Sequence, residues 1–171
     1  KYNTYFLRAH IAGFYRKGKN MIDWVKEKPE DIWESQNLTK VDNLGFETNL
    51  SLLPRELGNE RFFIRKIELG YAFIHQDKDS EGYISNYALD YLKHKFTAQL
   101  SHSIWKGFSA TWYVRWQDRA GSYTKYENLK PAYEEPYAPY CLVDMKVNWE
   151  YQRLNLYAEL NNLLNSTYYC C

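Results

Sequence analysis

The sequence lacks a long apolar run, has little cysteine and carries no excess of charge of one sign. No stretch approaches the ~18 consecutive apolar residues that a membrane-spanning helix needs. The lack of such a run does not exclude membrane-spanning β-strands, because each needs only about 9–11 residues with alternate positions apolar. Lysine and arginine number 22 against 21 aspartate and glutamate residues, so charge gives no reason to expect a nucleic-acid partner.

Residues for metal or covalent chemistry are also sparse. The chain has 3 cysteines, of which Cys141 lies in a strand-like pattern and Cys170 and Cys171 are adjacent. No CxxC or Cys/His spacing typical of a zinc site occurs, so we expect no metal and no cofactor. No GxSxG elbow or other nucleophile context accompanies the serine, histidine and aspartate residues, so an enzyme is not predicted.

Alternation is the dominant pattern that the sequence does contain. In "FSATWYVRWQ" (108–117), Phe108, Trp112 and Trp116 share one row of alternate positions, and Ser109 and Arg115 share the other. Successive side chains of an extended strand point to opposite faces. The segment therefore predicts a strand with one aromatic, apolar face and one polar face.

Similar alternation recurs along the whole chain, and no helical period competes with it. The segments that show it are 4–16, 43–52, 63–73, 95–104, 108–117, 141–152 and 154–161. The segment 63–73 is the least regular of them. We therefore predict an all-β protein with about seven antiparallel strands.

The connections between these segments alternate in length. Long connections are expected at 17–42, 76–94 and 118–140, and short ones at 53–62, 105–107 and 152–153. In an up-and-down antiparallel sheet, alternate connections lie at the same end. All long loops would then lie at one end, an asymmetry typical of outer-membrane barrels.

The apolar rows could contact either lipid or a protein core. A soluble up-and-down barrel or sandwich that binds a ligand would turn them inward. Aromatic residues near both ends of the rows, and long loops, favour a transmembrane barrel with a water-filled lumen. The residues then predicted to face lipid are Leu44, Phe46, Trp112, Val114, Val147, Trp149 and Leu156. Those predicted to face the lumen are Arg8, Glu47, Asn49, Lys66, Glu68, Arg115, Lys146 and Glu159.

Seven strands would not complete such a barrel. A sheet left open in a bilayer exposes backbone N–H and C=O groups that lipid cannot satisfy. We therefore expect residues 1–171 to form a partial barrel, a segment of a larger one.

Several stretches resemble the TonB-dependent outer-membrane receptors. They are "FYRKGKNMIDWV" (14–25), "NLTKVDNLGFETNLSL" (37–52), "SNYALDYLKHKF" (85–96) and "YCLVDMKVNWEYQRLNLYAELNNLLNSTYY" (140–169). The stretches 37–52 and 159–169 are the most specific. Within the family, the sequence is most similar to the cobalamin-type receptors.

The resemblance implies a 22-stranded barrel around a plug, with the plug domain and the closing strand outside this chain. Where the family would continue into a final strand, this sequence has Cys170 and Cys171. The implied function is import of a scarce, bulky nutrient, a corrinoid or an iron chelate, across the bacterial outer membrane. The implied partners are the lipid bilayer, the remainder of the barrel with its plug, the inner-membrane TonB complex and a surface lipoprotein.

Aromatic residues in the expected long loops are candidates for contact with a ligand or a surface partner. They are Trp24, Trp33, Tyr83, Tyr87, Tyr123, Tyr126, Tyr133 and Tyr137. Packing of the loops against each other is an equally good explanation for them.

Overall fold

The structure is a computed structural model that describes residues 1–28, 31–57, 62–79, 82–85, 91–127 and 130–168. Its long strands are β2 (Leu7–Lys26), β3 (Glu34–Leu52), β4 (Ile64–Asp79), β6 (Leu92–Trp105), β7 (Phe108–Arg119), β10 (Tyr140–Tyr151) and β11 (Leu154–Leu160). The shorter elements are β1 (Tyr2–Asn3), the 3₁₀ turn η1 (Pro54–Leu57), β5 (Ile84–Ser85), β8 (Ser122–Glu127) and β9 (Lys130–Pro136).

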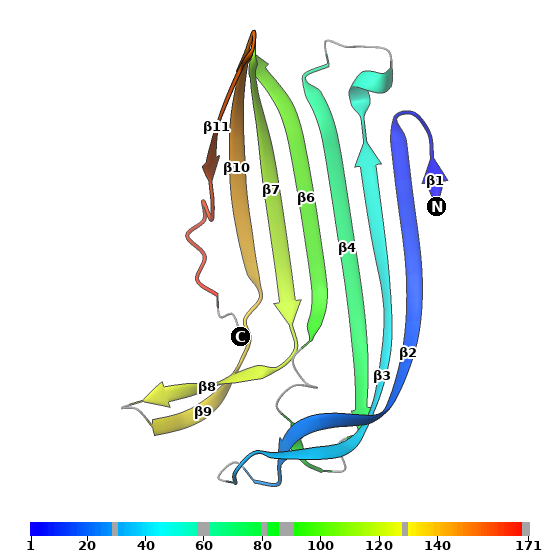
Figure 1. Ribbon diagram of the computed structural model, residues 1–171, viewed down its shortest axis with the longest axis vertical. Helices are drawn as coiled ribbons and strands as arrows, with labels where there is room; N and C mark the ends of the chain where they lie inside the picture. Colours follow the sequence, from blue (N-terminus) through cyan, green and yellow to red (C-terminus); the bar gives the residue numbers. More distant parts are fainter. Residues whose placement is uncertain (29–30, 58–61, 80–81, 86–90, 128–129, 169–171) are drawn as a thin grey trace.

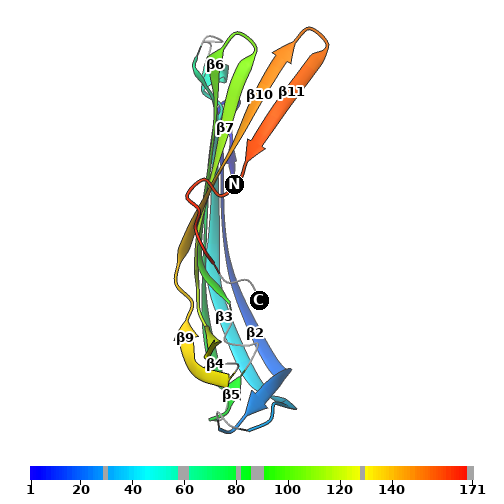
Figure 2. The ribbon, with the colours of Figure 1, turned by 90° about the vertical axis from the view of Figure 1, so that its left-hand side faces the viewer.

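The long strands form one antiparallel up-and-down sheet. Their order is β1-β2-β3-β4-β6-β7-β10-β11, β5 pairs with β2, and β8 and β9 form a separate hairpin. Figure 1 shows the strands side by side, and Figure 2 shows the same sheet edge-on as a single layer. The predicted all-β antiparallel architecture is confirmed. Among the described residues β1 and β11 do not pair, so the sheet is open.

The strand register gives the sheet two chemically different faces. Leu50 lies beside Leu69, and the row continues through Ala98, Val114 and Val143 on what we call the apolar face. One residue further along each strand, on what we call the polar face, the row reads Arg8, Ser51, Glu68, Gln99, Tyr113 and Asp144. Because side chains alternate, the register keeps each kind of side chain on its own face across the strands.

The strand ends differ from the predicted ones at the end of the sheet where the long connections lie. Strands β2 and β3 continue to Lys26 and from Glu34, so they occupy most of the loop that was expected at 17–42. The expected loop 118–140 contains the β8–β9 hairpin. The long connections expected there therefore consist largely of paired strand. In β2 the apolar residues Ile22 and Trp24 are exposed whereas Val25 is buried, so apolar side chains lie on both sides of the strand and leave no simple alternation to detect.

A bulge explains why the charged Arg65 interrupts the apolar alternate positions of segment 63–73. In the pairing of β4 with β6, Ile64 lies opposite His102 and Lys66 lies opposite Ser101, so Arg65 is the extra residue. A bulge shifts which face the following residues occupy. A strict two-residue count that runs through Arg65 therefore loses the register.

The sheet has little conventional core. Among the side chains that the structure describes, the buried apolar ones are Val25, Val41, Ala110 and Leu142, and the buried charged one is Asp23. Large apolar side chains such as Leu44 and Leu156 are 54% and 56% exposed. In the described part of the chain no second layer covers the apolar face, as Figure 2 shows. This arrangement differs from a soluble sandwich, in which that face would be inside.

Gly45 on β3 provides a test of how closely the strands and their side chains approach one another. A methyl group at Gly45 would lie 2.6 Å from the carbonyl oxygen of Phe73 and would also meet the Phe14 ring. A backbone oxygen cannot turn away. We expect Gly45→Ala to lower the free energy of unfolding by about 1–3 kcal/mol, measured by denaturant titration of the folded protein.

Gly70→Ala is the matched control for this substitution. A methyl group there would meet the side-chain oxygens of Thr97 and Asn49, at 2.6 and 2.9 Å. These side chains can change rotamer, so the expected loss is smaller. Equal losses for the two variants would contradict the proposed backbone clash at Gly45.

Candidate binding surfaces

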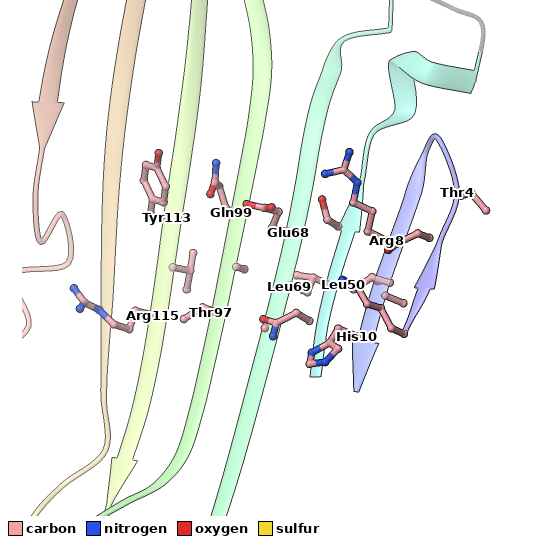
Figure 3. A pocket seen from close by; sticks show the side chains of 18 of the residues that line it. Thr4, Arg8, His10, Leu50, Glu68, Leu69, Thr97, Gln99, Tyr113 and Arg115 are labelled. Carbon is pink, nitrogen blue, oxygen red and sulfur yellow. The ribbon is translucent and has the colours of Figure 1, made fainter. Parts of the chain in front are cut away.

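Two neighbouring rows of polar side chains cross the middle of the polar face (Figure 3). Arg8, Glu68, Gln99 and Tyr113 belong to one row, and His10, Thr97 and Arg115 to the next. The rows line a hollow of about 1030 Å³ that reaches from the N-terminal residues Lys1 and Asn3 to Arg115 and Asp144. The sheet is a single layer, so this hollow is a concave part of its polar face.

Charges on the polar face are only partly paired. Lys66 Nζ lies 2.8 Å from Glu68 Oε1, and Lys146 Nζ lies 2.7 Å from Glu159 Oε1. Within the described ranges, Arg8 and Arg115 form no ion pair with a carboxylate. The face therefore presents guanidinium groups to whatever lies against it.

The residues predicted to face the lumen and those predicted to face lipid lie on opposite faces of the sheet. The predicted lumen-facing residues Arg8, Glu47, Asn49, Lys66, Glu68, Arg115, Lys146 and Glu159 all lie on the polar face. The predicted lipid-facing residues Leu44, Phe46, Trp112, Val114, Val147, Trp149 and Leu156 all lie on the apolar face.

Two histidines interrupt the apolar face, and each has polar and aromatic partners. The Tyr71 hydroxyl and His94 Nδ1 are hydrogen-bonded at 2.8 Å, and the rings of Phe73 and Trp116 lie beside His94. Near the other end, Trp112 Nε1 donates to His102 Nε2 at 3.1 Å. Each histidine is thus accommodated on an apolar surface by a hydrogen-bond partner on a neighbouring strand.

Four of the predicted loop aromatics lie in the β8–β9 hairpin or directly after it, and ring contacts are described for three of them. The rings of Tyr123 and Tyr137 are 5.6 Å apart, and Lys125 Nζ lies 5.4 Å from the centre of the Tyr133 ring. Tyr133 is 50% exposed. Tyr126 belongs to β8, with its side chain outside the described residues.

Ionic contacts connect the two strands of this hairpin. The Tyr123 hydroxyl donates to Glu135 Oε2 at 3.0 Å, and Lys125 Nζ lies 3.2 Å from the same oxygen. The bond from Tyr123, followed by that from Lys125, lowers the pKa of Glu135. The hydrogen bond with Tyr133, followed by that with Glu135, raises the pKa of Lys125.

A second hollow, of about 470 Å³, lies where β2 and β3 extend past the main sheet. Its lining includes Lys26, Glu34, Gln36 and the predicted aromatic Tyr83. Lys26 Nζ lies 4.5 Å from the centre of the predicted Trp33 ring.

Two predicted loop aromatics remain. Trp24 lies opposite Ser35 and is 47% exposed. Tyr87, like Cys170 and Cys171, is outside the described residues.

Several hydrogen bonds join residues that are far apart in the sequence and were not predicted. Arg55 and Arg65 both bond Ser103, and Asp144 accepts a hydrogen bond from the backbone N–H of Asn162 at 2.7 Å. Arginine in a connection and serine at a strand end are common residue types. No sequence signal would have singled them out.

Metal-ligating side chains are not grouped in the described residues. Those residues contain no group of three or more His, Cys, Asp or Glu side chains placed to hold a metal ion. No helix in the described ranges is long and apolar enough to cross a bilayer.

The fold is similar to a part of larger solved structures. One is the FrpB iron transporter from Neisseria meningitidis (F3-3 variant), with a TM-score of 0.65 and 16% identity over 98% of this chain. Another is the apoprotein form of its F5-1 variant, with a TM-score of 0.64 and 16% identity over 98% of this chain. The chain spans 26% of each. No curated protein matches it.

The family model described as "TonB dependent receptor-like, beta-barrel" matches residues 1–163. That range includes every long strand of the sheet, both of its faces and the hairpin. The chain therefore belongs to the TonB-dependent receptor-like β-barrel family.

Proposed function

We propose that this chain is part of the barrel wall of an outer-membrane, TonB-dependent transporter that imports a scarce, bulky nutrient. The observation that carries the proposal is the family match over residues 1–163, on a single-layer sheet with one apolar and one polar face. The whole protein's activity is inferred from this part. In this proposal the wall carries out no covalent chemistry.

Lipid is the proposed environment of the apolar face. Monomeric soluble proteins rarely expose large contiguous apolar surfaces, and this face exposes leucine, phenylalanine and tryptophan side chains over several strands. His94 and His102 are eight positions apart on β6, which is about 26 Å at ~3.3 Å per residue. That distance is close to the ~25 Å apolar band of outer-membrane barrels.

The rest of the barrel and the plug are proposed to come from outside residues 1–171. Strands β1 and β11 leave backbone groups at the sheet edges that further strands would satisfy. A plug would then lie against the polar face, where the hollow of about 1030 Å³ and the arginines are found. Through the plug, the inner-membrane TonB complex would supply the force for transport.

The end of the sheet with the long connections is the proposed entry side for the nutrient. Exposed aromatic rings such as Tyr133 and Trp24 are available there to a large ligand or a surface lipoprotein. The solved structures with this fold are named as iron transporters, which supports an iron chelate. The sequence resemblance to cobalamin-type receptors supports a corrinoid.

Labelling tests the proposed lipid environment. Val147 and Asn148 are neighbours on β10 whose side chains point to opposite faces. In the full-length protein in membranes, we expect a lipid-soluble thiol reagent to modify Val147→Cys at least about tenfold faster than Asn148→Cys. The preference should reverse with a membrane-impermeant reagent. Equal labelling of both sites by each reagent would contradict a lipid-facing apolar face.

Uptake by intact cells tests the proposed function. Deleting the gene should abolish high-affinity uptake of either a radiolabelled iron chelate or a labelled corrinoid, and deleting TonB should do the same. A control substrate small enough for porins should enter at an unchanged rate. Uptake that persists without TonB would refute the energy source, and loss of neither uptake would refute the substrate class.

The ionic contacts of the β8–β9 hairpin predict a pH dependence. The lowered pKa of Glu135 means that its contribution is complete above the ordinary value of 4.5 and is lost as pH falls through the folded-state pKa. The raised pKa of Lys125 means that its contribution is complete below 10.5 and is lost above its folded-state pKa. A spin label at Pro136→Cys should therefore become more mobile at both extremes of pH.

Two variants separate the causes of this dependence. Glu135→Gln should make the hairpin more mobile at neutral pH and remove the acid transition. Tyr123→Phe removes the largest cause of the lowered pKa, so the acid transition should move toward pH 4.5. An unchanged acid transition in both variants would show that Glu135 is not the titrating group.

A further inference from the structure

Two arginines converge on a single serine hydroxyl at the end of the sheet where the short turns lie. Arg55 Nη2 donates to Ser103 Oγ at 2.6 Å, and Arg65 Nε donates to the same oxygen at 2.9 Å. Arg55 belongs to η1, Arg65 is the bulged residue of β4, and Ser103 lies on β6. All three side chains are half-buried.

Among the described residues, the cluster has more hydrogen-bond donors than acceptors. A serine hydroxyl has two lone pairs and one hydrogen. The two arginines occupy both lone pairs of Ser103 Oγ, so its O–H is left to donate to a further acceptor. Arg55 Nε donates to the Phe62 carbonyl at 3.1 Å, and each guanidinium has several other N–H groups. An oxyanion is the group that such a set of donors fits.

The charges lead to the same conclusion. The two donating nitrogens lie within two hydrogen-bond lengths of each other, so the guanidinium groups repel one another across a neutral oxygen. In the described part of the chain, neither arginine has an ion pair with a carboxylate. A bound anion would convert this repulsion into two charge-assisted hydrogen bonds.

Beyond this cluster, the polar face carries charges of both signs that have no ion pair among the described residues, Glu47 and Asp144 as well as the arginines. Lys66 and Lys146 are paired with glutamates, whereas Arg8 and Arg115 have no carboxylate partner among the described residues. Ser103 lies opposite Ser109, one row from the pair Ser101 and Thr111 on the polar face. An anion held by Ser103 would therefore lie on the side proposed as the lumen, away from lipid.

We propose that Arg55, Arg65 and Ser103 form an anchoring site for a carboxylate side chain of the polypeptide that fills the barrel. This inference rests on the proposed function, since it requires a plug against the polar face. The planar fork of a guanidinium matches the two oxygens of a carboxylate. The anchored side chain holds the plug against the wall at the end opposite the nutrient-binding loops.

A thiol placed beside the site measures its charge without altering the three residues. In the full-length protein, with Cys141, Cys170 and Cys171 replaced by serine, Ser109→Cys is the reporter. Its reaction rates with an anionic and a cationic methanethiosulfonate are compared in the native state. They are compared again at a urea concentration that releases the plug while the barrel stays folded, shown by its mobility in unheated gel samples.

An occupied site should be nearly neutral, so we expect the two rates to agree within about threefold in the native protein. After release of the plug, the anionic reagent should react about tenfold faster, because two positive charges are then uncovered. Arg55→Gln and Arg65→Gln together should abolish that preference. Arg16→Gln, an exposed arginine in the middle of β2, should leave it unchanged.

Two outcomes would overturn the proposal. A tenfold anionic preference already present in the native protein, and suppressed by millimolar inorganic phosphate, would show a site for soluble oxyanions. No preference in either state would show that the arginines only brace the turn. The experiment reads labelling rates alone, so failure of the transport proposal in the uptake assay is a separate result.

Discussion

The structure depends on the backbone hydrogen-bond ladder, which keeps every strand in one register. Each strand places apolar and polar side chains on alternate sides, and pairing such as Leu50 beside Leu69 carries that division to the next strand. A slip of one residue in any pair would put a strand's charges among its neighbours' leucines. With so few buried side chains, the ladder and its register, rather than a packed core, define this fold.

The sequence predicted the central sheet well and the ends of its strands poorly, for one physical reason. Alternation records a difference between the environments on the two sides of a strand. Trp112 and Arg115 meet different environments, so their strand was predictable. At Lys125 polar side chains suit both sides, and its pairing with Tyr133 continues the strand without any pattern in the sequence. Bulges such as that at Arg65 defeat a strict two-residue count as well.

Individual side-chain contacts between strands could not be predicted, because they depend on the strand register and on which elements meet in space. Arg55 and Ser103 are separated by 48 positions, and Trp112 meets His102 across a strand pair. His102 interrupts an apolar row in the sequence. In the sheet its Nε2 accepts the indole N–H of Trp112, so neither group lacks a partner on the apolar face.

The two faces satisfy their polar groups in opposite ways. On the apolar face, His94 and His102 are hydrogen-bonded to neighbouring side chains, which suits the lipid environment that we propose for it. On the polar face, within the ranges that the structure describes, only some charges are paired, and the two arginines at Ser103 have more donors than acceptors. A sheet whose polar groups have partners on one face, and only partly on the other, is chemically suited to bind a partner on the second face. That asymmetry, rather than any single residue, is why we assign the polar face to the interior of a barrel.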